Sequence, residues 1–139
     1  MIQGWHNNDY LILFEEQREA VTMNGRYAVA SSLPDYNLVG LKSWDDFILR
    51  DAKNQFFTVP TVPLDVQYLQ PFDFDIDPSK LRADLRITNK IKWYIKPLVF
   101  GGDPSAESNV AWITIDEHVE AVKWWNQLYR DVKLKKSSA

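Results

Sequence analysis

The stretch Thr114–Lys133, TIDEHVEAVKWWNQLYRDVK, predicts the best-defined element of this 139-residue chain. Thr114 and Glu117 have the spacing of a capping box, in which each side chain satisfies a backbone N–H at the start of a helix. Apolar and aromatic side chains then recur every three or four residues, on one side of a helix: Ile115, His118, Val122, Trp125, Tyr129 and Val132. The pattern predicts a long amphipathic C-terminal helix.

Short strands are predicted upstream of this helix. Phe47–Arg50 and Gln55–Val59 flank the polar turn DAKN, an arrangement typical of a β-hairpin. Pro60 and Pro63 remove backbone donors, so the run around them is expected to be an edge or crossing segment. Residues 90–100, KIKWYIKPLVF, alternate apolar side chains with Lys and Tyr, which predicts a half-buried strand on which the C-terminal helix packs.

Two shorter helices are also predicted. Residues 15–22, EEQREAVT, are helix formers that follow a short strand, and Asn24-Gly25 is expected to end this helix. Residues 77–85 begin with Asp as N-cap and Pro at the first helical position. Together these patterns predict one α+β domain over residues 1–133, a mostly antiparallel sheet with helices on one face, followed by a solvated tail over residues 134–139.

The composition limits the possible function classes. The net charge of −3 and the pI near 5.3 argue against a nucleic-acid partner, because such proteins usually present a basic face. The absence of cysteine excludes disulfides and thiolate metal sites. Near the N-terminus the longest apolar run is YLILF, which is too short for a signal peptide or a membrane span, so we expect no membrane association and a cytoplasmic location.

No motif with a known catalytic mechanism is evident. His118 lies within the apolar side of the helix, where a structural histidine is favoured over a general base, and the spacing from His6 does not fit zinc. The acidic run Asp73–Asp77, DFDID, resembles the start of a calcium loop but has Pro78 at the position that requires glycine. We therefore expect no catalytic residues, no metal and no cofactor.

Aromatic residues make up 14% of the chain, and large aromatics serve either as core or as interface anchors. Trp44 precedes an acidic pair, Asp45 and Asp46, and an exposed acidic pair beside a tryptophan would suit a protein partner. Asp73 and Asp75 lie in an extended segment whose apolar residues are expected to face inward. These five residues, Trp44, Asp45, Asp46, Asp73 and Asp75, are the predicted partner-binding site.

Several short motifs carry a resemblance. The turn Leu33–Tyr36 has the form Leu-Pro-x-Tyr and leads to a glycine, and Phe100–Pro104 reads Phe-Gly-Gly-Asp-Pro. An asparagine, Asn109, and a helix with His118 and Trp125-Asn126 follow. In these features the chain resembles SUKH-type bacterial proteins, many of which are immunity proteins for secreted polymorphic toxins. The resemblance implies an α+β fold, no catalysis, and one-to-one neutralisation of a cognate toxin domain.

Three function classes follow from the sequence. The first is an immunity protein of a contact-dependent or type VI secretion system that blocks a toxin's active site. The second is a small hydrolase-like enzyme that uses His118 with a nearby carboxylate. The third is a phage or structural interaction module. The sequence does not specify an oligomeric state.

Overall fold

The structure, a computed structural model, describes residues 1–138, with side chains through Lys135. A six-stranded sheet has the order β1-β2-β3-β4-β5-β6, and every neighbouring pair is antiparallel. Its strands are β1 (Ile2–His6), β2 (Asp9–Leu13), β3 (Asn37–Lys42), β4 (Asp46–Arg50), β5 (Phe56–Pro60) and β6 (Gln70–Pro71). A separate antiparallel hairpin joins β7 (Ile91–Tyr94) to β8 (Val110–Ile113). The two α-helices are α1 (Gln17–Tyr27) and α2 (Ile115–Ser138).

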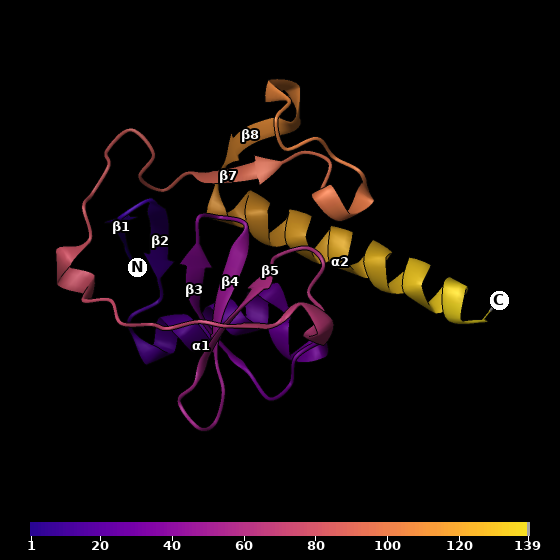
Figure 1. Cartoon of the computed structure of the whole chain (residues 1–139), viewed down its shortest axis with the longest axis horizontal. Helices are drawn as coiled ribbons and strands as arrows, with labels where there is room; N and C mark the ends of the chain where they lie inside the picture. Colours follow the sequence, from indigo (N-terminus) through magenta and orange to yellow (C-terminus); the bar gives the residue numbers. More distant parts are fainter. Residues whose placement is uncertain (139) are drawn as a thin grey trace.

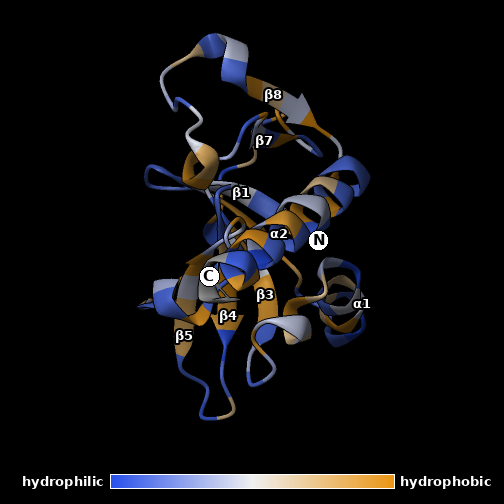
Figure 2. Cartoon of the chain, turned by 90° about the vertical axis from the view of Figure 1, so that its right-hand side faces the viewer, coloured by the Kyte–Doolittle hydropathy of each residue, from blue (hydrophilic) through white to orange (hydrophobic). Residues whose placement is uncertain are grey.

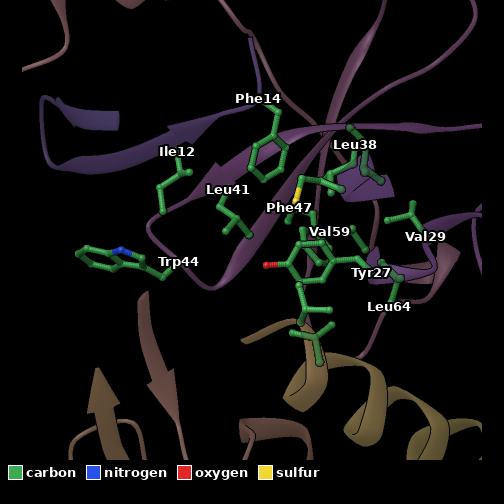
Figure 3. Close-up of a cluster of buried hydrophobic side chains, with 14 of the residues drawn as sticks. Ile12, Phe14, Tyr27, Val29, Leu38, Leu41, Trp44, Phe47, Val59 and Leu64 are labelled. Atoms are coloured by element: carbon green, nitrogen blue, oxygen red, sulfur yellow. The ribbon is translucent and has the colours of Figure 1, made fainter. Parts of the chain in front are cut away.

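Both α-helices cover the same face of the six-stranded sheet (Figure 1). Met23 and Tyr27 of α1 and Val119 and Val122 of α2 join one core cluster with sheet residues such as Phe47. Figure 3 shows Tyr27 among these side chains, and its ring lies edge-on to Phe47 with centroids 5.0 Å apart. The predicted α+β domain with helices on one face of an antiparallel sheet is therefore confirmed.

The second face of the sheet is covered by an extended segment rather than by a helix. Leu11, Leu13 and Ile48 are buried on this face because strand neighbours alternate between the two sides. Residues 72–81 lie over them with the inward-facing side chains Phe72, Phe74, Ile76 and Leu81. The expectation that the apolar residues of DFDID face inward is confirmed. Figure 2 shows the mostly hydrophobic colouring of β3, β4 and β5.

Helix α1 continues past Asn24-Gly25, so the predicted stop there is wrong. The Asn24 amide accepts a hydrogen bond from the Leu38 backbone nitrogen at 2.7 Å and donates to the Leu38 carbonyl oxygen at 3.3 Å. Asparagine is used here to bind the neighbouring strand β3, and the helix ends only at Ala28, which takes a left-handed φ of 55°. Local turn propensity was overridden by this tertiary contact.

Helix α2 begins as predicted. Thr114 N–H donates to Glu117 Oε1 at 3.0 Å, and Glu117 N–H donates to Thr114 Oγ1 at 3.2 Å. The buried side of the helix is rotated from the predicted one: it carries His118, Val119, Val122 and Asn126. Trp125 is only half-buried, packed between other rings, so its predicted place in the main core is corrected.

Other boundaries also differ. The strand predicted over residues 90–100 ends at Tyr94, because Pro97 starts a separate turn that contains the 3₁₀ helix η4 (Leu98–Phe100). The helix predicted over residues 77–85 is a single 3₁₀ turn, η3 (Pro78–Lys80), although Asp77 does cap it by accepting from Ser79 N–H at 3.0 Å. Strand β1 had no clear sequence signal.

The C-terminal segment is helical beyond the predicted domain end. Helix α2 passes Lys133 and ends at Ser138, and the Leu134 side chain on this part is exposed. Of the predicted tail, Ala139 lies outside the described residues.

Candidate functional site

A groove of about 310 Å³ opens beside the start of β4, between the end of β5 and the turn that follows β7. Mostly apolar and aromatic residues line it, with an aspartate pair at one end. We call this site the Asp45 groove; its lining residues are Asp45, Asp46, Pro60, Thr61, Val62, Pro63, Tyr68, Trp93, Tyr94, Pro97, Leu98 and Val99.

A strained turn presents the aspartate pair. Ser43 and Trp44 both take left-handed φ values, 48° and 63°, which cost free energy for residues other than glycine. The Trp44 ring is buried on the helix-covered side, and this burial holds the turn in place. Asp45 follows in the turn, and Asp46 begins β4.

The two carboxylates sit in different charge environments. Burial raises the pKa of Asp45 to about 6; Lys92 of β7 partly offsets this effect, and Asp46 adds to it. Burial also raises the pKa of Asp46, with Lys42 lowering it and Asp9 raising it. Neither carboxylate forms an ion pair or a side-chain hydrogen bond with any residue in the described part of the chain. Asp45 therefore carries a half-buried charge that lacks a direct partner within the protein.

One wall of the groove is held by Asn126 of α2, which is only 4% exposed. Its Oδ1 accepts from the Leu64 N–H at 2.7 Å, and its Nδ2 donates to the Thr61 carbonyl oxygen at 2.8 Å. These bonds fix the loop Thr61–Leu64, which includes the cis peptide Val62-Pro63. Asn126 thus pairs a buried carbonyl and a buried N–H of this loop.

The opposite wall is held in the same way by Asn109. Its Oδ1 accepts from the Lys96 N–H at 2.7 Å, and its Nδ2 donates to the Lys96 carbonyl oxygen at 3.0 Å. Gly102 closes this turn, and a Cβ atom there would collide with the Lys96 carbonyl. The turn thereby leaves Leu98 (47% exposed) and Val99 at the surface.

An aromatic surface continues from this wall onto α2. Phe100 of η4 packs against Trp125 with ring centroids 5.1 Å apart, and Trp125 lies edge-on to Trp124 at 4.8 Å. Trp124 is 61% exposed. Exposed aromatic and aliphatic residues next to a groove are typical of protein-binding surfaces.

Trp44 is not part of this surface, so its predicted role as an exposed anchor is corrected. Its side chain is 8% exposed and stacks on Tyr10 with centroids 5.1 Å apart, while Trp5 and Trp112 meet it edge-on. Tryptophan supplies a large apolar area, and the strained turn directs it inward, where it serves as core.

Asp73 and Asp75 lie apart from the Asp45 groove. Both are exposed on the segment that covers the second face of the sheet, and neither lines the groove. The predicted site therefore divides into three parts: Asp45 and Asp46 in the groove, Trp44 in the core, and Asp73 and Asp75 elsewhere on the surface.

His118 is enclosed in the core with an exposed fraction of 0%. Its Nδ1 lies 2.7 Å from the Tyr27 hydroxyl oxygen, and the rings of Tyr27 and Trp93 flank it edge-on. Burial lowers its pKa to about 3. Its Nε2 has no hydrogen-bond partner among the described residues, and no Asp or Glu among them orients the ring. A substrate has no route to His118 through the groove, which His118 does not line.

The groove residues Tyr68, Leu98 and Val99 and the exposed Trp124 were not predicted as site residues. Leu98 and Val99 were assigned to a strand. The signal that could have placed them at the surface is Pro97, since proline interrupts a strand and turns the following apolar residues outward. The pairing of segments near residues 45, 61, 68 and 98 has no local signal.

Within the described residues, no group of three or more His, Cys, Asp or Glu side chains is arranged to hold a metal ion. None of the helices among residues 1–138 combines the length and apolar character that crossing a bilayer requires. Comparison with protein-family models, with curated proteins and with solved structures gives no match. The resemblance to SUKH-type proteins stays a prediction.

Proposed function

We propose that this protein is a binding module that recognises another protein through the Asp45 groove and the aromatic surface beside it. The observation that carries the proposal is the groove itself: a preformed, mostly apolar cavity with a half-buried carboxylate that lacks a direct partner. Interfaces gain most of their affinity from a few aromatic and charged anchors in such desolvated pockets.

Rigidity of the groove supports binding. Asn126 and Asn109 each form hydrogen bonds to backbone groups of one wall. A surface that is already ordered loses less conformational entropy when a partner docks, and affinity rises accordingly.

The chemistry of the lining favours binding over catalysis. Asp45 has a pKa near the range used by general acids, but no His, Cys, Ser or Lys among the described residues lines the groove beside it. The hypothesis of a hydrolase-like enzyme depended on His118, and this residue is buried against Tyr27. Nothing in the fold specifically favours a phage or structural module.

Within this class, we propose that the protein acts in the cytoplasm as an immunity protein for a secreted toxin of its own or a kindred cell. The support is the resemblance in the sequence together with an acidic groove suited to a basic toxin domain, such as a nuclease. Docking there would block the toxin's active site and would require no chemistry from this chain.

Co-expression with the toxin encoded beside the gene tests this proposal. The wild-type protein should restore growth of cells that produce the toxin and should form a one-to-one complex with it in size-exclusion chromatography. Trp124→Ala should reduce protection, because it removes an exposed ring without opening the core. Absence of both protection and complex formation with every neighbouring toxin would refute the immunity role.

A further inference from the structure

We propose that the Asp45 groove accepts the guanidinium group of an arginine side chain presented by the protein partner, with the Asp45 carboxylate as its counter-charge. This inference rests on the proposed function and specifies the partner's anchor residue. It follows from the charge, the walls and the size of the groove.

The Asp45 carboxylate in the groove can form an ion pair with a cation from the partner. Lys92 is the positive group whose charge acts on Asp45, yet it forms no ion pair with Asp45. Its Nζ instead lies 5.0 Å from the centre of the Tyr94 ring and 3.4 Å from the Tyr94 hydroxyl. A cation attracts a partly buried carboxylate more strongly than a fully solvated carboxylate, because the local dielectric constant is lower.

The walls favour arginine over lysine. Aromatic rings of Tyr68, Trp93 and Tyr94 line the groove together with aliphatic side chains. The planar guanidinium stacks on aromatic faces and loses its hydration more readily than an ammonium group, and its three-carbon stem packs on apolar surface.

The groove is large enough to accept one such side chain. Its volume of about 310 Å³ lies at the lower end of the range for sites that enclose a whole small ligand. The aromatic surface that reaches Trp124 would lie under the neighbouring residues of the partner. The anchor is thus a single basic side chain within a larger apolar contact.

The probe is N-acetyl-arginine amide, titrated into the full ¹⁵N-labelled chain and followed by NMR, with N-acetyl-citrulline amide as the uncharged analogue of the same shape. We expect saturable shifts at the amides of Asp45, Thr61 and Leu98, with a Kd of roughly 1–10 mM for a ligand of this size. Citrulline should give no saturable shifts at these positions.

Two variants complete the test. Asp45→Asn keeps the side-chain shape and should weaken arginine binding about tenfold or more. Asp73→Asn removes the same charge from a site outside the groove and should leave the Kd unchanged. Equal shifts with arginine and citrulline, or an unchanged Kd in Asp45→Asn, would overturn the inference. If Asp45→Asn does not fold, the comparison of arginine and citrulline binding to the wild-type protein still tests the inference.

The outcome is separable from that of the proposed function. If arginine does not bind and Asp45→Asn still protects cells from the toxin, the proposal of an arginine pocket is refuted and the proposed immunity role is retained. If no toxin is neutralised but arginine binds as described, the pocket stands and the immunity role is wrong.

Discussion

The side chain of Asn126 on α2 accepts a hydrogen bond from the backbone N–H of Leu64 at a distance of 2.7 Å. The same amide donates to Thr61, so one buried helix residue satisfies both a donor and an acceptor of the loop that walls the Asp45 groove. Asn24 and Asn109 make the equivalent pair of bonds to Leu38 and Lys96. Each of the three asparagine amides thus pairs one backbone N–H and one backbone carbonyl of another segment.

Asn126→Ala should destabilise the fold strongly for a single polar substitution. It leaves the Leu64 N–H and the Thr61 carbonyl without partners in the core and should lower the free energy of unfolding by about 2–4 kcal/mol. Urea denaturation followed by tryptophan fluorescence measures the loss. Gln127→Ala, at the neighbouring exposed position, is the control and should change stability by about 0.5 kcal/mol or less. Equal effects of the two substitutions would contradict the role assigned to Asn126.

The adjacent tryptophans of α2 should respond differently to truncation. Trp125 packs on Phe100 and is half-buried, so Trp125→Ala should lower the free energy of unfolding by about 1–3 kcal/mol, below the range for a fully buried aromatic. Trp124 is mostly exposed, and Trp124→Ala should cost about 1 kcal/mol or less while weakening partner binding. Thermal unfolding of both variants, together with a toxin-binding assay, separates the two roles. A large stability loss in Trp124→Ala would place that ring in the core.

Asp45→Asn should stabilise the free protein at neutral pH. The folded-state pKa of about 6 lies above the ordinary value of 3.8, so the group stabilises the fold when protonated and loses this contribution as the pH rises through 6. At pH 7.5 the variant should be more stable than the wild type by about 0.5–1.5 kcal/mol, after allowance for solvent screening. The groups that act on Asp45 are Lys92 and Asp46, and both are retained in the variant.

The difference between Asp45→Asn and the wild type should shrink as the pH falls from 7 towards 4, because the wild-type carboxyl then takes up its proton. Denaturation curves at several pH values between 4 and 8 check this trend. Asp73→Asn removes an exposed charge and should follow the wild type throughout. A destabilised Asp45→Asn at pH 7.5 would show that the carboxylate supports the fold and would weaken the case for a binding role.

The elements with local signals could be predicted from the sequence. The capping box of Thr114, the hairpin around DAKN and the alternation in DFDID depend on spacing within a few residues, and each appears in the fold. The Asn24-Gly25 stop failed because the Asn24 side chain binds Leu38, a partner fourteen residues away. Local propensity cannot report such a contact.

The candidate site was predicted only in part for the same reason. Asp45 and Asp46 were found because they are adjacent in the sequence, but the walls of their groove come from segments brought together by the fold. The inward direction of Trp44 depends on two left-handed residues in its turn, and nothing in KSWDDF indicates that conformation. The rotation of the buried side of α2 towards Val119 likewise depends on where the sheet lies.

His118 should make the fold sensitive to mild acid. Its folded-state pKa of about 3 lies below the ordinary 6.5, so the unfolded chain binds the proton more readily. The stability that this neutral imidazole contributes is present above pH 6.5 and is lost as the pH falls from 6.5 towards 3, with a slope of up to about 1.4 kcal/mol per pH unit. His118→Phe cannot titrate, so the difference in unfolding free energy between wild type and variant should change with that slope between pH 6.5 and 5.

Asp45 titrates in this window with the opposite sign, but it is common to both proteins and cancels in the difference. The Tyr27 hydroxyl loses its partner in the variant, which lowers stability by a constant amount and leaves the slope unaffected. Parallel curves for the two proteins over this range would mean that the imidazole is protonated in the folded state and that water reaches it.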